Sequence, residues 1–201
     1  MGKTYDAIDA RLRTFIEEQP VFFVATAPLA DEGHINLSPK GTKGSLVVID
    51  DETVAYLDLT GSHAETVAHL RENSRITLMW CAFDGPPKVV RLHGRGEPVF
   101  RDDARWPDLL HLFPAADAPA IRAIVVVNAR RISDSCGFSI PCMDYRSERT
   151  LLTEFFERRS EEEHAAYCEQ KNGASIDGMP AIPLPLPVLP LPVVLGAPTT
   201  A

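Results

Sequence analysis

Two short polar segments of the sequence contain residue types suited to binding a phosphate group. In Pro39-Lys40-Gly41, an ammonium group stands beside a glycine whose backbone permits close approach. In Thr60-Gly61-Ser62, Gly61 allows a sharp turn between a strand-like and a helix-like run. The first N–H groups of a helix lack intrahelical partners and attract anions. Each segment could bind an anion, and the alternatives are a solvated loop lysine at Lys40 and a helix start that Ser62 and Glu65 cap themselves.

Thr60-Gly61-Ser62 lies where the spacing of apolar residues within 53–73 changes from that of a strand to that of a helix. Residues 53–59 are mostly apolar, as in a buried strand, and Val67 and Leu70 then recur at helical spacing. Ser62, followed three residues later by Glu65, has the form of a capping box, so we expect the helix to begin at Ser62. Under the structural alternative, these two side chains satisfy the free N–H groups themselves.

Composition excludes several classes of function. The chain has 201 residues, 45% of them hydrophobic and 24% charged, which is typical of one globular domain. A net charge of -8 argues against general binding to nucleic acid or to anionic membranes. The charged N-terminus has no apolar segment resembling a secretory signal, so we expect a cytoplasmic protein.

No motif in the sequence identifies a catalytic residue or a metal site. Cys81, Cys136, Cys142 and Cys168 lack metal-ligand spacing, and we assign them no metal and no disulfide. Ser135 lacks the context of an activated nucleophile. The catalytic residues are therefore left unknown.

Short apolar runs rich in β-branched and aromatic residues dominate the chain up to residue 132. Tight turns join most of them, which favours an antiparallel barrel over a parallel α/β sheet. Glycines at 94 and 96 predict a bulge or bend in the strand that contains them. Helices are predicted over 5–18 and 149–170. The predicted strands cover 21–27, 35–38, 46–49, 53–59, 75–83, 88–100 and 121–132.

The C-terminal part of the chain changes composition abruptly. From Met179 the sequence is uncharged, with a proline at every second or third position over much of its length. Because proline removes a backbone donor and interrupts helices, the composition favours an extended tail over a membrane span. An extended tail, of polyproline type, is predicted over 173–201.

The order of these pieces resembles a known family. The segments VFFVATA, HINLSPKG, YLDLTGSHAETVAHLRENSRITLMWCAF and KVVRLHGRGEPV are similar to the pyridoxamine 5'-phosphate oxidase-like flavin-binding split barrels, over about residues 10–135. CMDYRSERTLL and KNGASIDGMP resemble the C-terminal part of one branch of that family. The resemblance implies a mainly β (α+β) fold, a six-stranded antiparallel split β-barrel with peripheral helices, spanning residues 1–172.

The resemblance also implies a homodimer that holds FMN at its interface. It assigns cofactor contacts to the strand after the first hairpin, to the strand-to-helix junction and to one basic residue on a later strand. These positions are Asn36, Ser38, Pro39, Lys40, Gly41, Thr60, Gly61, Ser62, Glu65, Thr66 and Arg91.

Two features depart from the family pattern. Glu65 stands where many relatives carry a lysine that helps to bind phosphate, and a carboxylate there repels an anion unless it turns away. The C-terminal region also lacks the basic substrate motif of the true oxidases, so vitamin B6 oxidation is not supported.

The resulting hypothesis is an FMN-binding flavoprotein, an oxidoreductase acting on an unknown small molecule. The flavin would carry the redox chemistry, and the chain would supply orientation and a pocket. A non-catalytic flavin- or haem-binding module and a deazaflavin-dependent reductase remain the alternatives.

Overall fold

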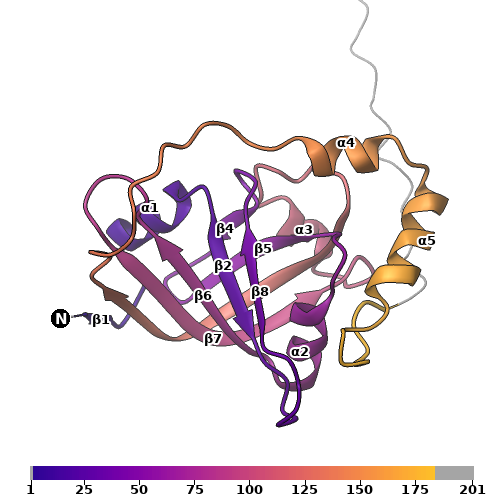
Figure 1. The fold of residues 1–201 in the computed structure, drawn as a ribbon, viewed down its shortest axis with the longest axis horizontal. Coiled ribbons are helices and arrows are strands. Elements are labelled where there is room, and N and C mark those ends of the chain that lie inside the picture. Colours follow the sequence, from indigo (N-terminus) through magenta and orange to yellow (C-terminus); the bar gives the residue numbers. More distant parts are fainter. Residues whose placement is uncertain (1, 184–201) are drawn as a thin grey trace, which may run out of the picture.

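A computed structural model describes residues 2–183 of the chain as one curled antiparallel sheet with five helices around it (Figure 1). The helices are α1 (Ala10–Glu18), α2 (Glu65–Asn73), α3 (Trp106–Leu110), α4 (Leu151–Glu157) and α5 (Glu161–Asn172). The strands are β1 (Thr4–Tyr5), β2 (Phe22–Thr26), β3 (Asn36–Lys40), β4 (Leu46–Val48), β5 (Thr53–Leu59), β6 (Arg75–Cys81), β7 (Val89–Val99) and β8 (Ile121–Ser135).

The strand order is β3-β2-β6-β7-β8-β5-β4, with β1 paired to β8. The predicted fold class, a mainly β antiparallel split barrel with peripheral helices, is confirmed. The sheet has eight strands where the family resemblance implied six. Seven of them, including β4, match the strands predicted from the sequence, and the short β1, paired with β8, is the addition. None of the helices described in residues 2–183 is long and apolar enough to cross a membrane.

Strand β7 contains the two glycines from which a bulge was predicted, and its pairing with β8 is irregular there. The register between β7 and β8 shifts between His93 and Gly94. A Cβ atom at Gly94 would lie 2.2 Å from the carbonyl oxygen of Asn128, so only glycine fits this close backbone approach. The predicted bulge is therefore confirmed at Gly94.

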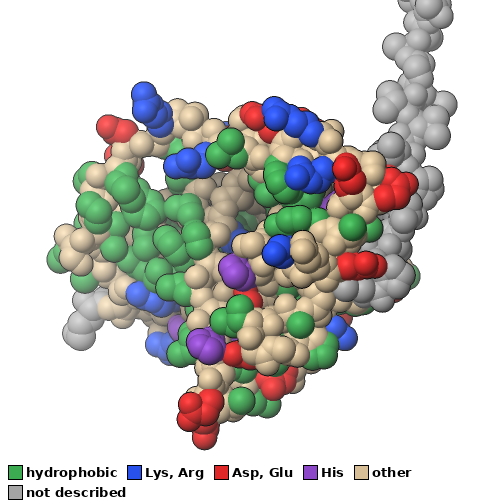
Figure 2. Space-filling model, turned by 45° about the vertical axis from the view of Figure 1, so that its right-hand side comes forward, with side chains coloured by type: hydrophobic (Ala, Val, Ile, Leu, Met, Phe, Trp, Pro, Cys, Tyr) green, Lys and Arg blue, Asp and Glu red, His purple; other side chains and the backbone are tan. Residues whose placement is uncertain are grey.

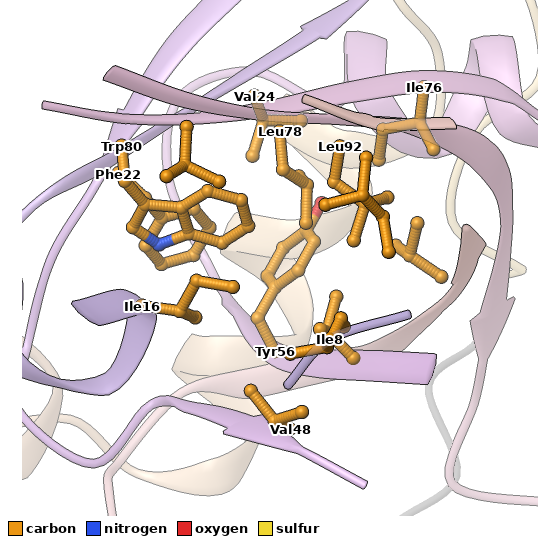
Figure 3. Packing of buried hydrophobic residues seen from close by; sticks show 14 of the residues in the cluster. Ile8, Ile16, Phe22, Val24, Val48, Tyr56, Ile76, Leu78, Trp80 and Leu92 are labelled. Atoms are coloured by element: carbon orange, nitrogen blue, oxygen red, sulfur yellow. The ribbon is translucent and has the colours of Figure 1, made fainter. Parts of the chain in front are cut away.

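The main core lies inside the curl of the sheet, and α1 covers one side of it (Figure 3). Phe22 stands between two large aromatic neighbours. Its ring centroid is 6.1 Å from that of Trp80 and 5.4 Å from that of Tyr56. Leu12 and Ile16 of α1 are buried against this cluster, as expected for the apolar stripe of an amphipathic helix.

A long connection runs from β8 to α4 across the top of the molecule in Figure 1. We call its residues 141–150 the strap. All ten are exposed, and the backbone N–H of Met143 donates to the carbonyl oxygen of Phe83 at 2.8 Å. Figure 2 shows a hollow in the face below this region, bordered by a patch of hydrophobic side chains.

The single helix predicted over 149–170 is instead two helices, α4 and α5, joined at Ser160. Ser160 accepts a hydrogen bond from the Glu163 backbone N–H, and the Glu163 side chain accepts one from the Ser160 N–H. This capping box begins a new helix and ends the expected continuity.

The chain stays packed beyond the predicted boundary at residue 172. The N–H groups of Ala181 and Ile182 donate to the carbonyls of Gly173 and Asn172, at 3.0 and 3.1 Å. Ala181 and Ile182 are buried, and Ala181 packs against Ala64 and Ala68. Packed structure therefore continues to residue 182, and residues 184–201 of the predicted tail lie outside the described residues.

We predict that Ile182→Ala lowers the free energy of unfolding by about 2–5 kcal/mol, as expected for truncating a buried aliphatic side chain. Ile176→Ala is the matched control, since Ile176 belongs to the same segment and is 60% exposed. Its cost should stay within about 0.5 kcal/mol. Equal urea midpoints for the two variants would mean that the segment does not contribute to the fold.

Candidate functional site

A cavity of about 860 Å³ lies between the ends of β3 and β5 on one side and the strap with the start of α4 on the other. Its volume falls in the range of pockets that hold small molecules and cofactors. Apolar, cationic and acidic side chains share its walls, the acids being Asp144 and Glu148 of the strap. The first wall includes Pro39, Lys40, Gly41, Leu57, Leu59, Thr60 and Gly61, and the second includes Tyr145, Arg146, Arg149, Leu151 and Leu152.

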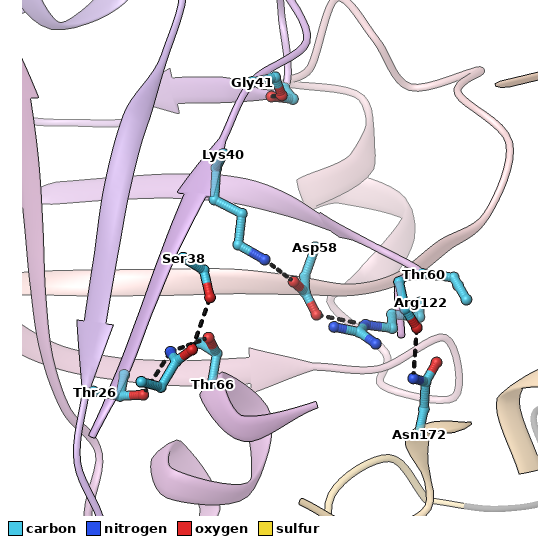
Figure 4. A network of polar contacts seen from close by, with 12 residues as sticks. Thr26, Ser38, Lys40, Gly41, Asp58, Thr60, Thr66, Arg122 and Asn172 are labelled. Atoms are coloured by element: carbon cyan, nitrogen blue, oxygen red, sulfur yellow. Dashed lines mark hydrogen bonds and ion pairs between the residues drawn. The ribbon is translucent and has the colours of Figure 1, made fainter. Parts of the chain in front are cut away.

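A buried ion cluster stands behind the first wall (Figure 4). Asp58 of β5 is fully buried; its Oδ1 accepts from Lys40 Nζ at 2.9 Å, and its Oδ2 accepts from Arg122 Nε at 2.8 Å. Lys40 comes from the end of β3 and Arg122 from β8, so the cluster ties three strands together. With two cations and one carboxylate, it retains one positive charge.

The protonation state of Asp58 is set by competition between burial and its neighbours. Burial raises the pKa of the carboxyl, but the charges of Arg122 and Lys40 outweigh it and lower the pKa to about 2. Because this value lies below the ordinary 3.8, ionised Asp58 contributes stability that is complete above pH 3.8 and is lost as the pH falls towards 2.

Gly61 lines the cavity, and the space beside its Cα is not filled by the chain. A Cβ atom placed there would meet no atom of the chain within 4 Å, and its φ lies outside the left-handed region. The predicted sharp turn therefore does not require glycine at this position. The open space is the feature that a bound molecule would use.

The predicted capping box at Ser62 and Glu65 does not form. Helix α2 begins at Glu65, and its N-cap, Ala64, makes no side-chain cap bond. Ser62 is exposed, whereas Glu65 is buried and its Oε1 accepts from the Ile176 N–H at 3.2 Å. The prediction was wrong because the C-terminal segment takes the carboxylate that the cap required.

Thr60 is held by groups distant in sequence. Its hydroxyl donates to the Ala120 carbonyl at 2.9 Å and lies 3.1 Å from Nε2 of His164 in α5. Since the hydroxyl proton goes to Ala120, the His164 ring is the donor in the second contact. Burial lowers the pKa of His164, and Arg101 lowers it further, so the ring is neutral at pH 7.

Asn36, Ser38 and Thr66 form a separate polar network that joins β3 to α2 (Figure 4). The amide nitrogen Nδ2 of Asn36 donates to the hydroxyls of Thr26 and Thr66, at 3.1 and 2.9 Å. The amide oxygen Oδ1 of Asn36 accepts a hydrogen bond from Ser38 Oγ at 2.7 Å. Thr26 Oγ1 lies 2.9 Å from Nδ1 of the buried His69. These contacts hold the edge strand β3 in place.

Arg91 lies on β7 and donates from Nη1 to the hydroxyl of Ser135 at 2.9 Å. It does not line the cavity.

The structure brings five of the predicted residues together at the cavity: Pro39, Lys40, Gly41, Thr60 and Gly61. The other six, Asn36, Ser38, Ser62, Glu65, Thr66 and Arg91, are not among its lining residues. Sequence reasoning missed Asp58, Arg122, Arg146 and Arg149. The first two carried a usable signal, since each is a charged residue within an otherwise apolar strand run.

Comparison with known sequences identifies the family. The sequence model described as pyridoxamine 5'-phosphate oxidase matches residues 8–136. The chain is 34% identical over 192 residues to the pyridoxamine 5'-phosphate oxidase family protein ustO of Aspergillus flavus, covering 89% of this chain and 77% of that protein. The chain belongs to the pyridoxamine 5'-phosphate oxidase family, as the sequence resemblance predicted.

Comparison with solved structures agrees with the fold. The H111A form of HupZ from Group A Streptococcus has a TM-score of 0.52 at 21% identity, covering 64% of this chain and 99% of that chain. A FAD-binding protein from Mesorhizobium loti has a TM-score of 0.46 at 14% identity, covering 67% and 95%. At these identities the similarity to HupZ concerns the fold alone.

We predict that Asp58→Asn destabilises the protein by about 3–5 kcal/mol, because it leaves the buried Arg122 without its counter-charge. Asp31→Asn, at an exposed turn, is the control and should change the unfolding free energy by less than about 0.5 kcal/mol. Urea denaturation at pH 7 measures both. If the two variants were equally stable, the cluster would not be a determinant of the fold.

Proposed function

We propose that this chain binds FMN in the cavity beside Lys40 and Gly61, and that it acts as a flavin-dependent oxidoreductase on a small molecule. The observation that carries the proposal is the open backbone at Gly61. No chain atom fills that space, and the φ angle gives no conformational reason for glycine. Membership of the pyridoxamine 5'-phosphate oxidase family supports the choice of a flavin.

The side chains around the cavity fit the chemistry of FMN. Its isoalloxazine ring is broad and largely apolar, and Leu57, Leu59 and Tyr145 offer matching surface. Its phosphate is an anion, and Lys40, Arg146 and Arg149 are among the lining side chains, together with the carboxylates of Asp144 and Glu148. Its ribityl hydroxyls need polar neighbours, which the Thr60-Gly61 backbone can supply.

A bound flavin supplies the redox chemistry itself. The chain would position the ring between the end of β5 and the strap, and its apolar wall would exclude water from one face. The buried ion cluster adds a net positive charge behind that wall.

We also propose that the protein is a homodimer. Ile35, next to the start of β3, and Leu37 within it are 78% and 66% exposed. Strand β3 pairs only with β2, so its other edge is open. Exposed apolar side chains beside an open edge favour association, and a two-fold partner is the usual solution.

The flavin site is tested with Gly61→Val. Because Gly61 lines the cavity, we expect the added isopropyl group to occupy space that the flavin needs, so FMN affinity should fall at least about tenfold, equivalent to about 1.4 kcal/mol. The fold should be unaffected, because a Cβ atom there meets no chain atom within 4 Å. Quenching of flavin fluorescence measures the affinity, and urea denaturation measures the stability.

Ser62→Val is the matched control, since Ser62 is adjacent and exposed and does not line the cavity. It should leave FMN affinity within about twofold of wild type. A wild-type protein that fails to quench FMN fluorescence would refute the proposed function. An equal loss of FMN affinity in Gly61→Val and Ser62→Val would refute the location of the site.

The dimer is tested by sedimentation velocity at micromolar concentration. Wild type should sediment as a dimer, and Leu37→Glu should shift the population to monomer, because it places a charge on the apolar surface. Glu32→Gln, at an exposed turn near β3, is the control and should remain dimeric. A monomeric wild type with flavin bound would contradict the proposal.

A further inference from the structure

The strap presents different side chains to two neighbouring cavities. Arg146 and Arg149 line the cavity that contains Lys40 and Gly61. Asp144, Tyr145 and Glu148 line this cavity and also a second one, of about 730 Å³, which includes Glu17, Glu18 and Asp84. The two carboxylates of the strap are thus shared between the cavities, Arg146 and Arg149 line only the first, and Glu17, Glu18 and Asp84 line only the second.

Lys40 is poorly placed to neutralise an anion in the first cavity. Its Nζ is 2.9 Å from the fully buried carboxylate of Asp58, and its side chain is only 19% exposed. A phosphate at Lys40 would therefore stand close to the charge of Asp58 and meet repulsion as well as attraction. Moving Lys40 away would weaken the compensation of a buried carboxylate.

Arg146 and Arg149 do not have this constraint. Within residues 2–183, no carboxylate oxygen lies within 4 Å of either guanidinium as an ion pair. The nearby acid Glu148 instead accepts a hydrogen bond from the hydroxyl of Tyr145, at 2.9 Å. Both guanidinium groups are thus free to bind an anion, and arginine is suited to bidentate contact with phosphate.

We infer that Arg146 and Arg149 of the strap bind the phosphate of FMN, while Lys40 serves to neutralise Asp58. The inference rests on the proposed function and deepens it by assigning the anion contact to residues outside the barrel strands. Because the strap is exposed along its whole length, binding of the phosphate would also hold the strap against the barrel.

The experiment compares the affinities of FMN and riboflavin, which differ by the phosphate alone. The double variant Arg146→Gln, Arg149→Gln should lose about 100-fold in FMN affinity, from about tenfold for each charge-assisted hydrogen bond. Its affinity for riboflavin should stay within about threefold of wild type. Arg158→Gln, on an exposed arginine outside the cavity, should leave both affinities unchanged.

Lys40→Gln distinguishes the two assignments. It should lower stability, yet change the ratio of FMN to riboflavin affinity much less than the double variant does. The inference would be overturned if Lys40→Gln strongly lowered the ratio of FMN to riboflavin affinity while the double variant left it unchanged. That result would assign the phosphate contact to Lys40.

Limited tryptic digestion of wild type gives a test that requires no variant to fold. FMN should slow cleavage after Arg146 and Arg149, and riboflavin should slow it less. Failure of FMN to protect these bonds would overturn the inference. Riboflavin binding as tightly as FMN to wild type would overturn it alone, whereas absence of any flavin binding would overturn the proposed function as well.

Discussion

The structure depends on the burial of one carboxylate, Asp58, between two cations. A buried carboxylate is strongly disfavoured unless its charge is compensated and its oxygens are hydrogen-bonded. Arg122 and Lys40 each satisfy one oxygen, at 2.8 and 2.9 Å. Since the three residues come from β5, β8 and β3, this requirement fixes the end of the edge strand β3 against strands that are distant in the sheet order.

The same requirement shapes the cavity. Lys40 reaches back to Asp58 from the end of β3, which leaves Pro39 and Gly41 beside Thr60 and Gly61 on one wall. The polar network of Asn36, Ser38 and Thr66 supports β3 from the side of α2. Under the proposed function, an anion in the cavity would meet Arg146 and Arg149, for which residues 2–183 supply no ion pair. We therefore infer that the charge needed for folding and the charge available for binding are carried by different residues.

Local patterns in the sequence predicted the strands and the antiparallel barrel, because alternation, turn residues and the glycine in β7 act over short distances. The family resemblance, and not a local pattern, placed Lys40 and Thr60-Gly61 in one site, and both line the same cavity. The lost cap at Ser62 could not be predicted, since the competing partner of Glu65 is the N–H of Ile176, which is remote in sequence. The burial of Ala181 and Ile182 could not be predicted either, because their packing partners are remote in sequence and the proline-rich composition around them indicates a tail.

The cluster around Asp58 shows where sequence reasoning stops. A charge within an apolar run was visible at both Asp58 and Arg122, but their pairing requires the register of β5 against β8, which sets Asp58 opposite Ala123. The arginines of the strap gave no periodic signal, because the strap is neither helix nor strand. Their relation to Lys40 is a property of the tertiary structure alone.

A crystal structure of the protein grown with FMN tests the central claim most directly. We expect the isoalloxazine ring against Leu57, Leu59 and Gly61, with Asp58 still paired to Lys40 and Arg122. Phosphate oxygens should lie about 2.7–2.9 Å from a strap guanidinium, the usual length for such contacts. A flavin bound outside this cavity, or a phosphate seated at the start of α2 beside Ser62, would contradict the account.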